Sequence, residues 1–329
     1  MERRAFCAGI DIGGTKLSAA LFSATGRPLG RRKTALDPGG GEAAARQVAD
    51  VVLELEAEAR RRNGRLLAAG LCIPGVVYQR TGRVWAPNIP GWDMFPLRAR
   101  LAKRTRLPLV IESDRSACIM GEVWRGAARG AHDAVFLAVG TGIGAGILAG
   151  GRLVHGHEDI AGAVGWFALD PAYKKDYARM GCFEAEASGA SLGRKARARL
   201  AAGEKSLMRS IAGGKLDAVT AETVARAARR GDRLALRLVR ETAGYLAMGV
   251  ANIISILNPE VVVLGGGLFQ AADLFLPLVR RETRRWAQPL AARAVRVEVS
   301  RLGEDAGLIG CGRIAWDAVA RRGEARGKS

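Results

Sequence analysis

The sequence predicts an α/β protein made of two similar domains with a nucleotide cleft between them. A strand, a turn rich in glycine and threonine and a second strand occur at 8–22 and again at 135–148. The two turns read D-I-G-G-T-K at 11–16 and G-T-G-I-G at 140–144. Glycine lets backbone N–H groups approach a ligand closely, and threonine adds a hydroxyl donor. Two such turns facing each other would hold a polyphosphate from both sides.

Length and composition support this organisation. A chain of 329 residues is long for one core and suits two domains. No apolar run reaches the roughly 18–20 residues of a membrane span, so we expect no membrane association. The apolar run near the N-terminus is short and broken by Asp11, so we expect no signal peptide. The five cysteines are scattered without a C-x-x-C pair, which is typical of a reduced, cytoplasmic protein. The net charge of +19 is spread along the chain, so solvated arginine-rich helix faces are favoured over a nucleic-acid surface.

The first domain is expected to cover residues 1–125. Residues 5–36 read as a three-stranded meander, and 42–62 has the apolar spacing of a helix that ends at Asn63-Gly64. A buried strand at 67–73 ends at Pro74-Gly75. The remaining expected elements are a short helix at 96–104, a strand at 107–111 and a helix at 115–125.

The second domain is expected to cover residues 126–329. Its meander is followed by a glycine-rich, irregular segment at 156–193. Helices are expected at 188–202, 221–230 and 233–257, and a fully buried strand at 261–264 runs into three glycines. A further helix, a strand near 295–299 and a closing helix at 307–320, which could pack back on the first domain, complete the chain.

The turns and the glycine triplet are candidates for the nucleotide site. Asp11 beside a phosphate turn is explained if it holds Mg²⁺, directly or through water; the alternative is a turn-capping aspartate. Lys16 would add positive charge at the phosphates, unless it is a solvated hairpin lysine. The triplet after a buried strand would let a ring or ribose lie against backbone. The residues expected at the cofactor are Asp11, Gly13, Gly14, Thr15, Lys16, Gly140, Thr141, Gly142, Gly265, Gly266 and Gly267.

Asp114 is the candidate catalytic base. It follows a buried strand at the carboxyl end, where the sites of α/β proteins usually lie. An aspartate there could deprotonate a substrate hydroxyl, as the catalytic-loop aspartate of kinases does. The alternative, which does not exclude the first, is an N-cap for the helix that begins at Arg115.

Seven motifs together resemble those of the ROK family of sugar kinases and sugar-responsive repressors, over nearly the whole chain. They read D-I-G-G-T-K at 11–16, I-P-G-V-V at 73–77, A-P-N-I-P-G-W at 86–92, E-S-D at 112–114, G-T-G-I-G-A-G at 140–146, G-C-F-E at 181–184 and N-P-E-V-V-V-L-G-G-G at 258–267. The resemblance implies two actin-like, ribonuclease H-like domains with ATP between them. It also implies an aspartate base at Asp114 and sugar contacts from Asn88 and Glu184.

The substrate half departs from the family pattern. Ser113 replaces the family's asparagine before the base, and Ala163 and Trp166 replace its sugar-binding glutamate and its sugar- and zinc-binding histidine. The family's zinc loop C-x-C-G-x-x-G-C reads K-D-Y-A-R-M-G-C at 175–182, so that Tyr177 replaces one cysteine and only Cys182 remains. One thiolate cannot make a tetrahedral site, so we predict no zinc. The upstream histidines at 155 and 157 read as surface residues. The expected substrate residues are Gly75, Asn88, Ser113, Asp114, Trp166 and Glu184.

Segment 162–184 is then expected to be ordered by the packing of four aromatic residues in place of a metal. The aromatic residues in question are Trp166, Phe167, Tyr173 and Tyr177.

These observations predict an ATP- and Mg²⁺-dependent kinase for a sugar or sugar-like polyol, with a remodelled pocket, weak activity on glucose and a homodimeric state. One alternative is a non-catalytic sugar- or nucleotide-binding regulatory relative, although a protein without catalysis has no need for the base Asp114. A DNA-binding repressor is the other. The family's repressors carry a winged helix before the phosphate motif, and the motif begins here at Asp11.

Overall fold

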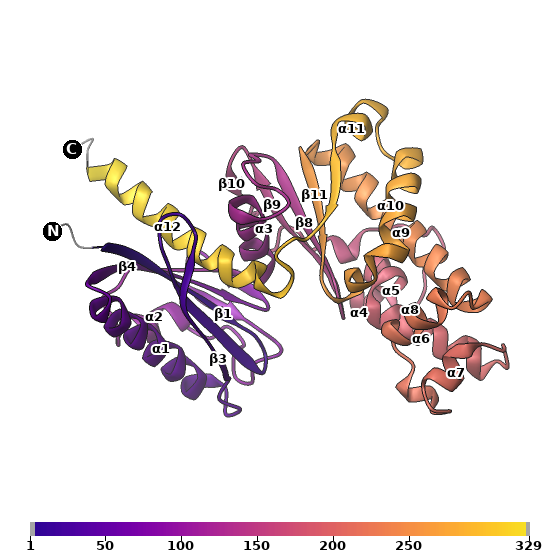
Figure 1. Cartoon of the computed structure of the whole chain (residues 1–329), viewed down its shortest axis with the longest axis horizontal. Coiled ribbons are helices and arrows are strands. Elements are labelled where there is room, and N and C mark those ends of the chain that lie inside the picture. Colours follow the sequence, from indigo (N-terminus) through magenta and orange to yellow (C-terminus); the bar gives the residue numbers. More distant parts are fainter. Residues whose placement is uncertain (1–3, 327–329) are drawn as a thin grey trace. The chain divides into compact units, whose positions relative to one another are not determined.

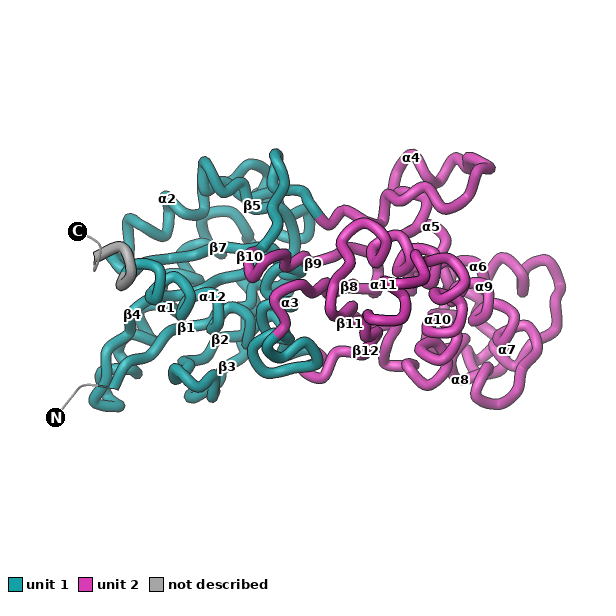
Figure 2. The backbone as a smooth tube through the Cα atoms, turned by 90° about the horizontal axis from the view of Figure 1, so that it is seen from above, with its two compact units in different colours: residues 1–130, 153–161, 304–329 teal, residues 131–152, 162–303 magenta. Residues whose placement is uncertain are grey.

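Two compact units make up the chain in the computed structural model, which describes residues 4–326 and side chains up to 322. Unit 1 comprises residues 1–130, 153–161 and 304–329, and unit 2 comprises 131–152 and 162–303, as Figure 2 shows. The domain boundary that the sequence suggests after residue 125 stays a prediction. The outer ends of the two predicted domains, 1–3 and 327–329, lie outside the described residues.

Unit 1 is built on a five-stranded sheet with the order β3-β2-β1-β4-β7. The first three strands form the predicted antiparallel meander, whereas β1, β4 and β7 run parallel. Their carboxyl ends meet at one edge, because Cys72 pairs with Asp11 on one side and with Glu112 on the other. The strands are β1 (Arg4–Ile12), β2 (Lys16–Phe22), β3 (Pro28–Ala35), β4 (Gly64–Ile73) and β7 (Leu109–Ser113).

Helices cover both faces of this sheet (Figure 1). Side chains alternate along β1, so that Phe6, Ala8 and Ile10 pack with the buried face of α1, while Cys7 packs with residues of α12. A short hairpin that the sequence did not reveal, β5–β6, precedes α2. These elements are α1 (Gly41–Arg61), β5 (Val76–Tyr78), β6 (Arg83–Trp85), α2 (Leu97–Ala102), α3 (Asp114–Arg125) and α12 (Ala306–Arg326).

Glycines allow α12 to lie directly against the backbone of unit 1. A Cβ on Gly70 of β4 would lie 2.1 Å from the carbonyl oxygen of Cys311, and one on Gly9 of β1 would lie 2.7 Å from that of Leu308. A Cβ on Gly310 of α12 would lie 1.7 Å from the carbonyl oxygen of Ala117 in α3. Any larger side chain at these positions would push the helix away.

Unit 2 repeats the sheet plan with the order β10-β9-β8-β11-β12. β8 and β9 are antiparallel, and β11 pairs in parallel with both β8 and β12. This is the strand arrangement of unit 1, so the structure supports the internal similarity that the two turns indicated. The strands are β8 (Ala134–Val139), β9 (Ile143–Ala149), β10 (Arg152–Leu153), β11 (Val261–Gly265) and β12 (Arg296–Val299).

Helices form in unit 2 at the three predicted places, 188–202, 221–230 and 233–257, and the third, α9, has the predicted bounds. The prediction of an irregular segment at 156–193 was wrong for its second half, where α4, α5 and the start of α6 form. The helices are α4 (Tyr177–Met180), α5 (Cys182–Ala187), α6 (Gly189–Ala201), α7 (Leu207–Ile211), α8 (Ala221–Arg229), α9 (Arg233–Leu257), α10 (Ala272–Trp286) and α11 (Pro289–Ala294).

Within residues 4–326, none of the helices combines the length and the apolar character that crossing a membrane requires.

Replacing Gly310 by alanine tests the close packing of α12. Because the new Cβ would collide with the carbonyl oxygen of Ala117, we expect Gly310→Ala to destabilise the protein by about 1–3 kcal/mol or more. Gly244→Ala is the matched control, since it also lies in a helix and a Cβ there would meet nothing within 4 Å. The control should be neutral or raise stability by up to about 1 kcal/mol. Thermal unfolding measures both, and equal midpoints would contradict the packing argument.

Candidate active site

Asp11 is the next-to-last residue of β1 and lies at the carboxyl edge of the unit 1 sheet. Its Oδ1 accepts a hydrogen bond from the thiol of Cys72, 3.1 Å away on the neighbouring strand. The first turn of α12 approaches from the other side, because a Cβ on Gly307 would lie 3.2 Å from Oδ2. Burial raises the pKa of Asp11, which the Cys72 hydrogen bond and Lys16 partly offset and the nearby charge of Asp305 reinforces. A cation beside this carboxylate would be stabilised.

The first glycine turn is a tight hairpin between β1 and β2. The N–H of Gly13 donates to the carbonyl oxygen of Lys16 at 2.8 Å, which closes the turn. Gly14 lies against Asn88, since a Cβ there would be 3.0 Å from its carbonyl oxygen. Thr15 is exposed, and the Lys16 ammonium lies 3.7 Å from Glu304. The structure therefore brings a predicted sugar residue to the predicted phosphate turn.

Asp114 is the first residue of α3, directly after β7. The predicted alternative of Asp114 as the N-cap was wrong: Ser113 caps the helix, its Oγ accepting from the N–H of Ser116 at 3.2 Å. Asp114 accepts from the N–H of Arg115 at 2.8 Å, and 45% of its side chain is exposed. Desolvation raises the pKa of Asp114 to about 6, with Arg115 opposing and the charge of Asp11 adding to the rise. Asp11 and Asp114 thus interact electrostatically at one edge of the sheet.

Gly75 follows β4 and has a packing reason to be glycine. A Cβ there would lie 2.0 Å from the carbonyl oxygen of Trp85 in the β5–β6 hairpin. This contact holds the loop that carries Asn88 next to the strand. Gly75 thus supports the predicted sugar loop through backbone packing.

The second glycine turn joins β8 and β9 in unit 2. The N–H of Gly140 donates to the carbonyl oxygen of Gly142 at 2.9 Å, and Thr141 is exposed at the tip. Glu184 of α5 accepts from the N–H of Ile143 at 2.8 Å, and a Cβ on Gly142 would lie 2.7 Å from the same carboxylate oxygen. The predicted sugar residue Glu184 is therefore bonded to the second phosphate turn.

The glycine triplet begins at Gly265, the last residue of β11, and its members have different roles. A Cβ on Gly265 would lie 2.2 Å from the ring of Phe136, and one on Gly266 would lie 2.5 Å from the carbonyl oxygen of Val139. Gly266 also has a φ of 89°. Both are thus required by packing. Gly267 has open space around it. A Cβ on Gly140 would lie 3.9 Å from the backbone nitrogen of Gly267. The triplet and the second turn lie side by side.

The aromatic residues of segment 162–184 do not all pack as predicted. Trp166 ends the short 3₁₀ helix η1 (Val164–Trp166) with 58% of its surface exposed, and Tyr173 is 74% exposed. Tyr177 is buried, and Phe167 stacks on Phe183. The prediction was therefore correct for two of the four residues. Trp166 does not fill a space in the core.

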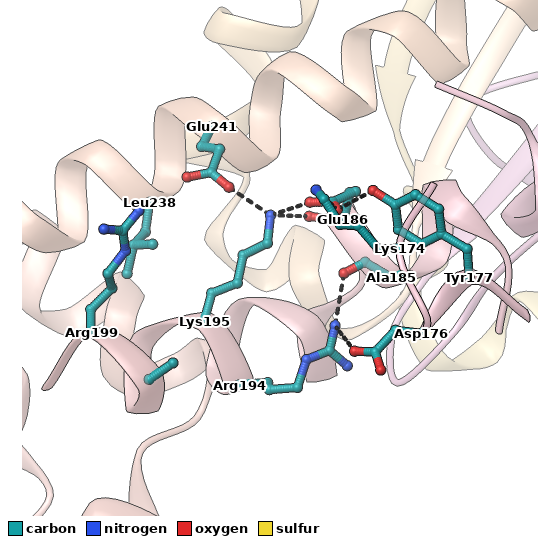
Figure 3. A pocket seen from close by; sticks show the side chains of 11 residues that line it. Lys174, Asp176, Tyr177, Ala185, Glu186, Arg194, Lys195, Arg199, Leu238 and Glu241 are labelled. Atoms are coloured by element: carbon teal, nitrogen blue, oxygen red, sulfur yellow. Dashed lines mark hydrogen bonds and ion pairs between the residues drawn. The ribbon is translucent and has the colours of Figure 1, made fainter. Parts of the chain in front are cut away.

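A cluster of charges around the buried Glu186 carboxylate holds this segment instead (Figure 3). The Glu186 carboxylate accepts from the Tyr177 hydroxyl and from the ammonium groups of Lys174 and Lys195, each 2.7 Å away. Lys195 also pairs with Glu241 of α9 at 2.7 Å. Burial alone would raise the pKa of Glu186, but these donors lower it to about 2. The cluster connects α4, α5, α6 and α9, and α5 carries Glu184.

Cys182, the remaining cysteine of the zinc pattern, has a packing role. It is buried beside Tyr177, and its sulfur accepts from the N–H of Leu169 at 3.4 Å. Among residues 4–326 no three His, Cys, Asp or Glu side chains are grouped so that they could hold a metal ion.

The sequence missed Cys72 and Glu186 as supports of the site. Cys72 could have been found, because its strand ends at the same edge as Asp11. Glu186 could not, since its partners Lys174, Lys195 and Glu241 come from separate segments without a common spacing.

Known proteins resemble the chain along nearly its whole length. A family model described as the ROK family matches residues 7–318. The glucokinase of Halalkalibacterium halodurans is 32% identical over 92% of this chain and 93% of that protein. The ROK hexokinase structure from Thermus thermophilus has a TM-score of 0.80 at 32% identity, covering 96% of this chain and 99% of that chain. A ROK family glucokinase from Streptomyces griseus, in complex with glucose and AMPPNP, has a TM-score of 0.75 at 31% identity, covering 95% and 99%. These similarities confirm the predicted actin-like α/β fold.

The pH dependence of stability tests the Glu186 cluster. We expect Glu186→Gln to lower the free energy of unfolding by about 1.5–3 kcal/mol, the range for hydrogen bonds to charged groups. Because the folded pKa of Glu186 is lowered from 4.5 to about 2, the difference should be complete above pH 5 and shrink as the pH falls toward 2. Glu241→Gln removes one half-exposed ion pair and should cost no more than about 1 kcal/mol. A pH-independent difference would contradict the assignment.

Proposed function

Because this chain belongs to the ROK family, we propose that it transfers the γ-phosphoryl group of ATP to a hydroxyl of a sugar or sugar-like polyol. The observation that carries the proposal is the placement of Asp114 at the carboxyl end of β7, beside Asp11 and with a pKa of about 6. Such a carboxylate is largely ionised at neutral pH, yet it is basic enough to accept a proton.

The proposed reaction needs one proton acceptor and precise positioning. The substrate hydroxyl attacks the γ-phosphorus, the bond from that phosphorus to the β–γ bridging oxygen breaks, and ADP leaves. The hydroxyl proton passes to Asp114. Ser113 supports this base, because its N-cap hydrogen bond fixes the start of α3. Phosphoryl transfer depends chiefly on positioning and charge stabilisation, so a fixed base on a rigid element suits it.

The proposed cofactors are ATP and Mg²⁺. Asp11 is the residue that would hold the metal, directly or through water, since a carboxylate oxygen is a preferred ligand of magnesium. The surroundings fit a cation, because the negative charge of Asp305 acts on Asp11 and the charge of Asp11 in turn acts on Asp114. When bound, the metal would offset the charge of the phosphates. Each unit by itself offers backbone for a nucleotide, unit 1 at its glycine turn and unit 2 at the second turn and at Gly267.

We also propose that the protein works without zinc. Tyr177 stands where the family pattern has a cysteine, and its hydroxyl is bonded to Glu186. Cys182 is bonded to the Leu169 N–H. These partners give the two positions a role that needs no metal.

The proposed partner is a small sugar-like molecule, and we propose a homodimer that does not act on DNA or membranes. A non-catalytic regulatory relative is the second candidate, favoured by Ala163 and Trp166 at positions where the family pattern binds sugar. The position of Asp114 on a capped helix favours the enzyme.

Asp114→Asn tests the base. The amide keeps the shape of the side chain and cannot accept the proton, so kcat should fall by about 10²–10⁴-fold while ATP affinity is retained. The wild-type rate should fall as the pH decreases through about 6, where Asp114 becomes protonated. Asp217→Asn, an exposed aspartate of unit 2, is the control. Assays use ATP with a panel of hexoses, amino sugars, deoxysugars and cyclitols. Near-normal kcat in Asp114→Asn would exclude the assignment.

Trp166→His tests the remodelled pocket. An indole stacks on the C–H face of a ring and accepts no hydrogen bond, so wild-type kcat/KM on glucose should lie below about 10⁴ M⁻¹s⁻¹. Because Trp166 is 58% exposed, the change should barely affect thermal stability and should shift preference toward glucose. Tyr173→His, at an exposed aromatic in the same segment, should leave preference unchanged. Efficient glucose phosphorylation by the wild type would refute the idea.

A further inference from the structure

Residues 153–161 form a strap that belongs to unit 1, although the chain before and after them belongs to unit 2. Two of the three histidines of the protein lie in it, and the proposed reaction uses neither. The strap folds back on itself, because the N–H of Ala161 donates to the carbonyl oxygen of His155 at 2.9 Å. Gly156 and Asp159 have φ values of 78° and 59°, which make this return possible.

Two polar contacts anchor the strap at the end of β7. Nε2 of His155 lies 2.9 and 3.1 Å from the two carboxylate oxygens of Glu112, whose side chain is only 7% exposed. The carboxylate of Asp159 accepts from the N–H of Gln79 at 2.9 Å, and the Gln79 amide donates to the carbonyl oxygen of Ile111 at 3.0 Å. Both contacts therefore act on the strand residues just before Ser113.

The Glu112 carboxylate needs this partner. A buried carboxylate without a donor is costly, and the room left beside it is about 10 Å³, no more than one water requires. Glu112 is also two residues before Asp114 on the same stretch of backbone. Movement of Glu112 toward solvent would shift the Ser113 cap and the start of α3.

We propose that His155 is a positioning residue for phosphoryl transfer: as an imidazolium it holds the Glu112 carboxylate and thereby fixes Ser113 and Asp114. This proposal rests on the proposed kinase function and adds a residue that the motifs do not include. His155 touches neither substrate nor nucleotide in this role; it acts through Glu112.

The charges around His155 favour its protonated form. Glu112 faces it from β7 and Asp159 from the strap, while Arg115 of α3 lines the same small cavity. The Glu112 hydrogen bond raises the pKa of His155, burial opposes the rise, and the charges of Glu112 and Asp159 add to it. A raised pKa means that the ion pair is complete below about pH 6.5 and is lost as the pH rises through the higher folded value. The contact therefore weakens on the alkaline side.

The pH dependence of kcat distinguishes this role from a merely structural one. Wild-type activity should rise through about pH 6 as Asp114 ionises and decline at alkaline pH as His155 loses its proton. His155→Gln should lack the alkaline decline and have a maximal kcat about tenfold lower, since misplacing a reacting group by about 1 Å costs up to about 10²-fold. His155→Lys keeps the charge and should restore much of the rate, without the decline.

His157→Gln is the matched control, because this histidine lies two residues away and its side chain is 96% exposed. It should keep the wild-type profile. NMR titration of the His155 imidazole gives a second measurement that needs no catalysis: its midpoint should lie above 6.5 and fall in Glu112→Gln.

Three outcomes separate the two proposals. An alkaline decline that persists in His155→Gln, or a wild-type midpoint at or below 6.5, would overturn the role of His155 while leaving the kinase proposal intact. A wild-type protein that transfers phosphate to none of the tested sugars would overturn the kinase function, and the positioning role with it. Loss of the decline in His155→Gln, with rescue by lysine, supports the proposal.

Discussion

Direct backbone contact between α12 and the unit 1 sheet is the constraint on which the candidate site depends. Alternate residues of β1 face opposite sides, and the side toward α12 presents Cys7 and Gly9. With glycine at Gly9, Gly70 and Gly310, the helix lies close enough to contact β1, β4 and α3 together. Its first turn then reaches Asp11, and its middle fixes the helix that begins at Asp114. The separation of the two carboxylates is thus set by backbone packing.

Because β1, β4 and β7 are paired in parallel, their polar side chains lie in a row at one edge of this sheet. Asp11, Cys72 and Glu112 are neighbours across the three strands, and Asp114 follows two residues later. Neighbouring carboxylates oppose one another's ionisation: the charge of Asp11 adds to the raised pKa of Asp114, and the charge of Asp305, just before α12, adds to the raised pKa of Asp11. A cation would neutralise the charge of Asp11, and a proton taken from the substrate would neutralise that of Asp114. One edge of the sheet can therefore serve both metal binding and base catalysis.

The sequence predicted what local patterns determine. Apolar spacing predicted both meanders and α9, and the position of Asp114 directly after a strand was correct, although β7 is only partly buried. The β5–β6 hairpin was missed because three-residue strands carry no periodic signal. The Glu186 cluster and the His155–Glu112 pair were missed because their members meet only after folding. For Gly265 and Gly266 the sequence pattern suggested a ligand site. The structure shows that both positions must also be glycine because of close packing against Phe136 and Val139.

Ion pairing at Glu186 also explains why Trp166 is available at the surface. Lys174, Tyr177 and Lys195 satisfy the buried carboxylate, and Phe167 stacks on Phe183. These contacts anchor the segment on both sides of α5, so its order does not require the indole. A large aromatic side chain that is not needed for packing loses hydrophobic stabilisation by remaining in water. Covering its face with a ring would recover that stabilisation, so an exposed Trp166 next to the Glu184-bearing helix favours a ligand with an apolar face.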